Sequence, residues 1–252
     1  WVNKLVNEHF ADHIIAVSPA TRDNLTEGGI SPQKITVVMN GVAPVEETGP
    51  EDRAKLRQAL SIPPDTVVFG ILARIEDYKG HLYLVHAAKL LKEQGRSGFR
   101  VLIAGTGSFE EDVARAVGEM GVEDVVQMLG FRADVAALLN ILDVQLNASY
   151  GTEATSLALL EGMSLGLPTI ASDYGGNPWL VTDGENGLLF PSRDSQSMAK
   201  AMAYLMDRPE ERREMGRQAR ERFQTSFTGQ VFAKNIENVY QGVLKGDPHG
   251  RK

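Results

Sequence analysis

Short runs rich in valine and isoleucine alternate with longer amphipathic segments along most of this sequence. Uninterrupted apolar runs are typical of strands that are buried on both faces of a parallel sheet, and the amphipathic segments between them are typical of crossover helices. The sequence therefore predicts an α/β fold with a doubly wound parallel sheet. We expect strands at residues 13–17, 34–39, 66–72, 100–104, 125–128, 144–146, 168–171 and 187–190.

A polar segment at residues 44–50 separates two parts of the chain. It begins and ends with proline and shows no hydrophobic periodicity, which is typical of a linker. Residues 1–43 before it have the pattern of one βαβ unit, and residues 51–225 after it carry the remaining strands. The last predicted strand is followed by a helical pattern that is interrupted at Pro209 and near Thr228.

The composition narrows the classes of function. The 252 residues carry a formal net charge of −7, which argues against a nucleic-acid partner because such proteins present an electropositive face. The absence of cysteine excludes disulfide and thiolate chemistry and fits a cytoplasmic protein. No apolar run approaches the roughly 20 residues of a spanning helix, so we expect any membrane contact of the full-length protein to be peripheral.

Two cations follow the predicted strand at residues 66–72. Ligands of open parallel sheets bind beyond the carboxyl ends of the strands, so Arg74 and Lys79 stand where a ligand is expected. Their side chains can converge on one phosphate group. The alternative is that both are solvated surface residues.

Glycines and an aromatic residue follow the next two strands. At Gly105 and Gly107 the missing side chains let a ligand approach the backbone and a helix N-terminus, although a tight turn without function is the alternative. The third glycine of a dinucleotide fingerprint would fall at Glu110, which excludes a nicotinamide cofactor. Phe131 and Arg132 can present backbone polar groups and an aromatic edge to a base, or they form a turn with a core phenylalanine.

Two carboxylates, Glu153 and Glu161, are eight residues apart in a segment that predicts a loop entering a helix. On a helix this spacing gives about 12 Å of rise and about 80° of rotation, so the pair cannot share a proton or a metal but can grip the two ends of an extended ligand. The N–H groups of Ala154, Thr155 and Ser156 would form the first helical turn and bind a diphosphate. The alternative is ordinary complementation of the helix dipole and a surface glutamate.

Other catalytic motifs are excluded. Residues 162–166 match a nucleophile elbow, but a predicted helix precedes them and a strand follows, which is the reverse of the hydrolase motif. The sequence has no Gly-Lys-Ser/Thr phosphate loop, no zinc-binding spacing of histidines and no Asp-x-Asp pair. We therefore predict no metal ligands and no cofactor, so Arg74, Lys79 and a helix N-terminus would neutralise a bound diphosphate.

Taken together, these residues resemble the retaining GT-B glycosyltransferases of group 1 or family 4, which include bacterial phosphatidylinositol mannosyltransferases, lipopolysaccharide glucosyltransferases and sucrose-type synthases. The resemblance spans nearly the whole chain and depends on the order and spacing of its motifs. The motifs are Asn40-Gly41-Val42, Arg74 with Lys79-Gly80, Gly105-Thr106-Gly107, Gly130-Phe131, Glu153 with Glu161, Gly166-Leu167-Pro168-Thr169-Ile170-Ala171-Ser172, Gly175-Gly176 and Asp183-Gly184-Glu185-Asn186-Gly187-Leu188-Leu189.

The resemblance implies a Rossmann-like donor-binding domain whose parent enzyme transfers a sugar from a UDP- or GDP-sugar to a glycan or lipid acceptor, with retention and without a metal. Arg74 and Lys79 would hold the diphosphate and stabilise the leaving nucleotide. Glu153 would contact the transferred sugar and Glu161 the ribose. The amides of residues 154–156 would bind the distal phosphate, and the loop at 131–132 would contact the base.

In this family an acceptor domain precedes the donor domain. The sequence begins at Trp1 within a helical pattern, so we interpret the chain as part of a longer protein. Residues 1–43 would be a remnant βαβ unit of the acceptor domain, and residues 226–252 a C-terminal helix that returns toward it. We expect this chain alone to bind donor weakly and to transfer nothing.

Two positions depart from the family pattern. Trp179 stands where relatives commonly have a glutamate, which would alter the sugar pocket, and Ala73 replaces a glycine. Two alternative functions stay open. A nucleotide-sugar epimerase would keep the diphosphate site without needing the glutamate pair, and a non-catalytic module would bind the nucleotide sugar only. The sequence does not specify the sugar, the nucleotide or the acceptor.

Overall fold

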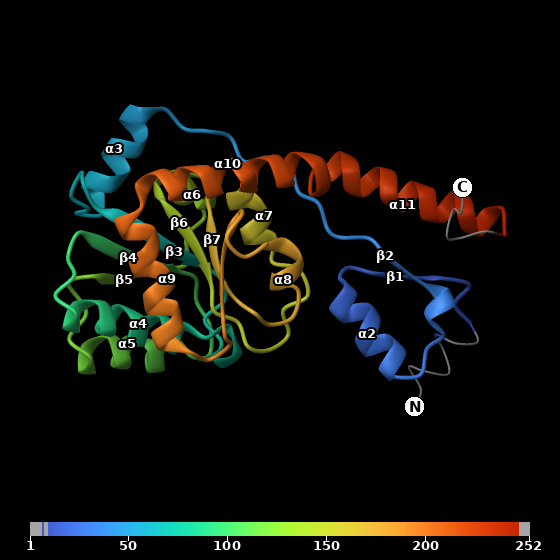
Figure 1. Cartoon of the computed structure of the whole chain (residues 1–252), viewed down its shortest axis with the longest axis horizontal. Coiled ribbons are helices and arrows are strands. Elements are labelled where there is room, and N and C mark those ends of the chain that lie inside the picture. Colours follow the sequence, from blue (N-terminus) through green and yellow to red (C-terminus); the bar gives the residue numbers. More distant parts are fainter. Residues whose placement is uncertain (1–6, 8–9, 247–252) are drawn as a thin grey trace.

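The structure, a computed structural model, describes residue 7 and residues 10–246. These residues form a larger part with a six-stranded parallel sheet and a smaller part with a two-stranded parallel sheet (Figure 1). The α/β fold with a doubly wound sheet is confirmed. The helical pattern predicted at Trp1 and the end of the predicted C-terminal segment, residues 247–252, lie outside the described residues.

The strands of the larger sheet are β3 (Val67–Leu72), β4 (Phe99–Ala104), β5 (Val126–Gly130), β6 (Val144–Asn147), β7 (Thr169–Ser172) and β8 (Gly187–Phe190). Their spatial order is β5-β4-β3-β6-β7-β8. The chain adds β4 and β5 on one side of β3 and then crosses to β6 on the other side. Such a reversal leaves a crevice beyond the carboxyl ends of the two central strands, which here are β3 and β6.

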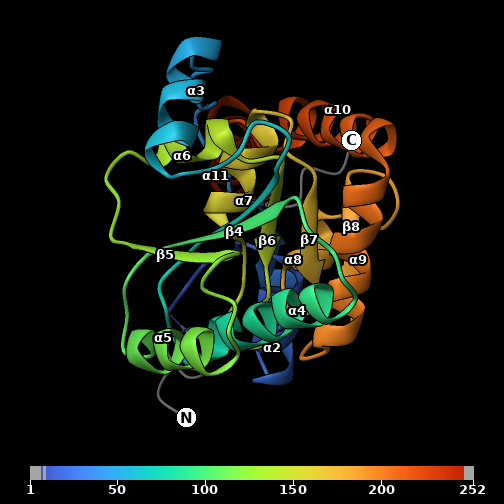
Figure 2. The ribbon, with the colours of Figure 1, turned by 90° about the vertical axis from the view of Figure 1, so that its left-hand side faces the viewer.

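The helices of the larger part are α3 (Pro50–Ala59), α4 (His81–Glu93), α5 (Glu110–Glu119), α6 (Val135–Ile141), α7 (Leu157–Ser164), α8 (Asn177–Leu180), α9 (Ser195–Asp207) and α10 (Pro209–Ser226). They cover both faces of the sheet (Figures 1 and 2). Successive side chains of a strand point to opposite faces. Phe69 and Ile71 of β3 therefore pack in one core with α4, α5 and α9, while Val68 packs in another with α6.

The predicted strands of the larger part all occur within two residues of their expected bounds. The predicted interruptions of the C-terminal helical pattern are also confirmed, because α10 begins at Pro209 and α11 (Gly229–Leu244) follows Thr228. The Thr228 hydroxyl accepts the Val231 N–H at 3.2 Å and so caps α11. Within the described part of the chain, none of the helices combines the length and apolar character that a membrane crossing requires.

The smaller part is the predicted βαβ unit. Strands β1 (Ile14–Ala16) and β2 (Ile35–Val37) pair in parallel, and α2 (Pro19–Glu27) connects them. Ser18 caps α2 by accepting the Thr21 N–H at 3.1 Å. A small core that contains Ala16, Ile30 and Ile35 lies inside this unit.

Backbone contacts join the two parts where the chain leaves the smaller one. The Val42 N–H donates to Phe227 O at 3.0 Å, and the Gly229 N–H donates to Val42 O at 2.9 Å. A Cβ at Gly41 would lie 2.3 Å from Thr228 O, so only glycine allows this approach. From there α11 extends on the side of β1 and β2 in Figure 1. The domain boundaries, and the packing of residues 226–252 on residues 1–43, stay predictions.

Candidate functional site

A cavity of about 510 Å³ lies beyond the carboxyl ends of β3 and β6, where the strand order reverses. Its walls come from β3, β6, the loops that follow both strands, and the segment that enters α7. Five of the residues predicted for the site line it together, although they come from distant parts of the sequence. These are Arg74, Lys79, Glu153, Thr155 and Ser156.

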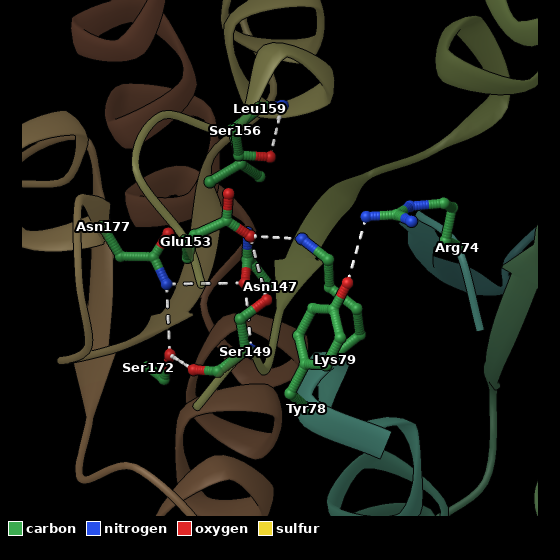
Figure 3. A network of polar contacts seen from close by, with 10 residues as sticks. All are labelled: Arg74, Tyr78, Lys79, Asn147, Ser149, Glu153, Ser156, Leu159, Ser172 and Asn177. Carbon is green, nitrogen blue, oxygen red and sulfur yellow. Dashed lines mark hydrogen bonds and ion pairs between the residues drawn. The ribbon is translucent and has the colours of Figure 1, made fainter. Parts of the chain in front are cut away.

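The charged centre of this cavity is an ion pair. Lys79 lies in a short 3₁₀ turn, η2 (Asp77–Lys79), and its Nζ is 2.8 Å from Oε2 of Glu153. The two side chains are only 15% and 7% exposed, so the pair is largely shielded from water. Asn147 Nδ2 and Ser149 Oγ also donate to Oε2, at 3.2 and 2.9 Å (Figure 3). All three donors therefore meet one oxygen of the carboxylate.

A second layer of buried polar groups supports these donors. The Asn147 Oδ1 accepts the Ser149 N–H at 3.0 Å and Asn177 Nδ2 at 3.4 Å. Asn177 also donates to the Ser172 hydroxyl at 3.1 Å, and this hydroxyl donates to Ser149 O at 2.5 Å. These residues lie at the ends of β6 and β7 and at the start of α8. None of them was among the site residues predicted from the sequence, although polar residues at the carboxyl end of an apolar strand were a usable signal.

The double glycine of the sequence holds the loop that carries Glu153. The Gly176 N–H donates to Glu153 O at 2.8 Å. A Cβ at Gly176 would lie 1.7 Å from Ala154 O, and one at Gly175, where φ is +61°, would lie 2.2 Å from Glu153 O. Both positions require glycine because two backbone segments touch there.

Arg74 lies on the other side of the cavity from this loop. Its NH2 donates to the Tyr78 hydroxyl at 3.0 Å, and Figure 3 shows its guanidinium on the same side of the network as Lys79. The Tyr78 carbonyl in turn accepts the Tyr150 N–H at 2.8 Å, which ties the loop after β3 to the loop after β6. Within residues 7 and 10–246, no three His, Asp or Glu side chains are arranged to hold a metal ion.

The prediction that Ala154, Thr155 and Ser156 form the first turn of a helix is wrong. Helix α7 begins at Leu157, and Ser156 is its N-cap, whose hydroxyl accepts the Leu159 N–H at 3.4 Å. Serine favours the cap position because it supplies an acceptor to an unpaired helical N–H. Glu153 therefore lies outside the helix, and the 12 Å separation calculated for a continuous helix does not apply. The N-terminus of α7 still borders the cavity, since residues 155–159 line it.

Glu161 lies on α7, one turn after Leu157 and therefore on the same face of the helix. Leu157 lines the cavity, whereas Glu161 lies beyond its wall. The Glu161 carboxylate is half-buried and has no hydrogen bond or ion pair with any described residue. Burial raises the pKa of Glu161. The group is thus a partly desolvated acceptor without a partner in the described chain.

Gly105 and Gly107 lie against the chain's own loop after β3, and their contact with a donor stays a prediction. A Cβ at Gly105 would lie 1.9 Å from Ala73 O, and one at Gly107 would lie 2.1 Å from Ile75 O. The Ile75 N–H donates to Thr106 O at 2.9 Å. The missing side chains therefore leave room for the chain's own loop after β3. Helix α5 begins at Glu110, three residues after Gly107.

Phe131 and Arg132 follow β5 and lie outside the wall of the cavity. Phe131 is 76% exposed, so the alternative of a core phenylalanine is wrong. Arg132 forms two hydrogen bonds with Asp134, of 2.8 Å from Nε and 2.6 Å from NH2. The guanidinium of Arg132 is therefore paired with Asp134, whereas the ring of Phe131 is exposed to solvent.

The sequence was compared with models of protein families and with curated proteins, and both comparisons find glycosyltransferases. Residues 52–222 match the family described as glycosyl transferases group 1, and residues 1–46 match glycosyltransferase family 4. D-inositol 3-phosphate glycosyltransferase of Corynebacterium efficiens is 30% identical over 228 residues, which cover 87% of this chain and 53% of the relative. The putative glycosyltransferase EpsD of Bacillus subtilis is 29% identical over 79% of this chain and 51% of the relative. The chain thus spans about half the length of these relatives.

Solved structures resemble the fold closely. Anabaena Alr3699/HepE in complex with UDP and glucose has a TM-score of 0.87 and 25% identity, over 95% of this chain and 66% of that one. Its complex with UDP-glucose has a TM-score of 0.85, also with 25% identity, over 94% and 66% of the two chains. Sucrose-phosphate synthase of Thermosynechococcus elongatus has a TM-score of 0.83 with 25% identity, over 98% and 61%.

Proposed function

Because the chain belongs to the group 1 glycosyl transferases, we propose that its larger part binds a sugar nucleotide in the cavity between β3 and β6. The observation that carries this proposal is the convergence of two cations, Arg74 and Lys79, with the buried carboxylate of Glu153 on one cavity. The UDP and UDP-glucose complexes of the structural neighbour from Anabaena support it. The nucleotide is UDP or GDP.

The diphosphate would lie between the two cations and the N-terminus of α7. Arg74 and Lys79 come from the loop after β3, and residues 155–159 of the α7 entry face them across the cavity. Cationic side chains and the unpaired N–H groups of a helix N-terminus both favour a bound anion. The same groups would stabilise the charge that develops on the leaving nucleotide, so no metal ion is required in this proposal.

The two glutamates would bind hydroxyl groups at opposite ends of the donor. Oε1 of Glu153 is not used by Lys79, Asn147 or Ser149, and it would accept from a hydroxyl of the transferred sugar. Glu161 would accept from the ribose hydroxyls. A half-buried carboxylate without a partner is costly, and two hydroxyl donors would remove that cost. The exposed Phe131, with the backbone around Arg132, would contact the base.

The proposed reaction of the whole protein is transfer of the sugar to a hydroxyl of a glycan or lipid acceptor. The acceptor oxygen forms a bond to the anomeric carbon while the bond from that carbon to the phosphate oxygen breaks, and the acceptor proton passes to the departing phosphate. Attack on the face from which the phosphate leaves retains the anomeric configuration. In this proposal residues 51–225 form the donor domain, and residues 1–43 belong to the acceptor domain with residues 226–252 returning to them.

Replacement of Glu161 by glutamine tests the ribose site. Burial raises the folded-state pKa of Glu161, so the ionised form destabilises the fold above that pKa. We expect Glu161→Gln to raise the thermal midpoint of the free chain at pH 7, with a smaller gain as the pH falls and Glu161 protonates. The affinity for UDP or GDP should fall about tenfold, because a neutral acceptor replaces a charged one. Thermal unfolding and calorimetric titration measure both effects.

The matched control for this variant is Glu119→Gln, at an exposed glutamate near the end of α5. It should change neither the thermal midpoint nor the affinity. Retention of full affinity in Glu161→Gln would remove Glu161 from the site. If the unchanged chain binds neither UDP, GDP nor their sugar derivatives, the proposed function itself is wrong.

A further inference from the structure

The three hydrogen bonds to Glu153 come from groups of two kinds. Lys79 is charged, has a long flexible side chain and borders the cavity. Asn147 and Ser149 also line the cavity, but they are neutral, short and buried. A bound diphosphate would attract the charged Lys79. It would attract the neutral side chains of Asn147 and Ser149 much less, and both residues are held by hydrogen bonds to neighbouring residues. The bonds from Asn147 and Ser149 are therefore the ones that can persist when a donor binds.

The orientation of the Asn147 amide is determined by its neighbours. Its Oδ1 accepts from the Ser149 N–H and from Asn177 Nδ2, which are both donors. The opposite orientation of the amide would place donors against donors, so Nδ2 must face Glu153. Ser149 is fixed in turn by its own backbone, because its carbonyl accepts the Ser172 hydroxyl. Both groups are thus held as donors toward the same oxygen.

The consequence for Glu153 is an asymmetric carboxylate. Oε2 receives three hydrogen bonds, and no described residue donates to Oε1. Figure 3 shows Oε1 turned away from the three donors, on the side of Ser156. A buried carboxylate with one satisfied and one open oxygen is a rigid acceptor for a hydroxyl in the cavity.

We propose that Asn147 and Ser149 are positioning residues, which hold the Glu153 carboxylate in place with Oε1 presented to the transferred sugar after Lys79 has turned from Glu153 to the donor diphosphate. This inference rests on the proposed function and adds a means of sugar recognition to it. Although Asn147 and Ser149 line the cavity, in this proposal their side chains bind Glu153 and not the nucleotide. They act on the sugar only through Glu153, so their loss weakens binding of a sugar nucleotide more than binding of the nucleoside diphosphate.

The test is calorimetric titration of the chain with UDP-glucose, UDP-galactose and GDP-mannose, and with UDP and GDP. The sugar nucleotide that the unchanged chain binds most tightly, and its own nucleoside diphosphate, are then titrated against Ser149→Ala. We expect the affinity for the sugar nucleotide to fall about tenfold, as loss of one hydrogen bond to a charged group predicts, and the affinity for the nucleoside diphosphate to stay within about twofold. Ser149→Thr, which keeps the hydroxyl, should bind the sugar nucleotide as tightly as the unchanged chain does.

Asn147→Ala provides a second variant, with Asn186→Ala as its matched control. Asn186 is a buried asparagine in the turn before β8, where it accepts the Thr182 N–H and donates to Leu180 O, outside the cavity wall. Both variants should lower the thermal midpoint, but only Asn147→Ala should change the ratio of the two affinities. A ratio that moves equally in both would indicate a structural role and overturn the proposal.

The failure of this inference can be distinguished from failure of the proposed function. If Glu161→Gln weakens binding of the nucleoside diphosphate while Ser149→Ala leaves both affinities unchanged, the nucleotide site stands and the positioning role is wrong. An equal loss of both affinities in Ser149→Ala would also contradict it. If the unchanged chain binds none of the five ligands, the proposed function fails and this inference fails with it.

Discussion

Replacement of Lys79 by methionine should lower the free energy of unfolding of the ligand-free chain by about 3 kcal/mol. The variant leaves the Glu153 carboxylate buried without its cation, and an uncompensated buried charge is strongly destabilising. The expected loss is at the lower end for such a change because Asn147 and Ser149 still donate to Oε2. Urea unfolding followed by circular dichroism measures it. Stabilisation by UDP, GDP or their sugar derivatives should disappear in the same variant.

A double variant separates the two roles of Lys79. In Lys79→Met/Glu153→Gln the buried carboxylate is also neutral, so most of the lost stability should return, because replacing both members of a buried ion pair costs far less than removing one. Ligand binding should not return, since the cation is still missing. Lys89→Met is the matched control, because Lys89 pairs with Glu93 at 3.6 Å on the exposed surface of α4 and should contribute less than about 0.5 kcal/mol. A double variant as unstable as Lys79→Met would contradict the pairing.

Acidification should destabilise the chain through His81, the first residue of α4. Its imidazole is buried, and neither ring nitrogen has a hydrogen-bond partner among the residues that the structure describes. Burial, with a smaller contribution from the charge of Lys79, lowers the pKa of His81 from 6.5 to about 4. The folded state therefore binds this proton less readily than the unfolded state. The stability is fully present above pH 6.5 and is lost as the pH falls toward 4, by about 3 kcal/mol in total.

The measurement is urea unfolding at a series of pH values between 7 and 4, in the unchanged chain and in His81→Leu. Leucine has a similar volume and does not titrate, so the slope of stability against pH should become much smaller in this window. His86→Leu is the control, because His86 is exposed on the same helix and its loss should leave the slope unchanged. An identical slope in the unchanged chain and His81→Leu would show that His81 is not the titrating group.

The ion pair between Lys79 and Glu153 lies at the wall of the cavity in which the donor is proposed to bind. Each partner would acquire a new contact on binding, since Lys79 would turn to the diphosphate while Oε1 of Glu153 accepts from the sugar. When Lys79 turns away, the Glu153 carboxylate would still have hydrogen-bond donors, because Asn147 and Ser149 would continue to donate to Oε2. Under the proposed function, the Glu153 carboxylate would therefore keep hydrogen-bond donors both before and after the donor binds.

Local patterns determined most of the fold. The positions of the strands follow from apolar runs, and the breaks at Pro209 and Thr228 follow from residues that end or cap helices. The placement of Arg74 and Lys79 beside a cavity follows from one general rule, that loops after parallel strands converge at one edge of a sheet. These properties depend on residues close together in the sequence, which is why periodicity reveals them.

The tertiary structure alone decided the detailed shape of the site. Residues 154–156 have the composition of a first helical turn, yet the backbone of Gly176 holds Glu153 in a loop and Ser156 becomes the cap of α7. Gly105 and Gly107 admit the chain's own loop after β3, at distances that no local pattern encodes. The donors to Glu153 come from two separate segments of the chain, the turn after β3 and the end of β6. Contacts between backbones far apart in sequence leave no periodic trace, so only the folded chain reveals which groups meet.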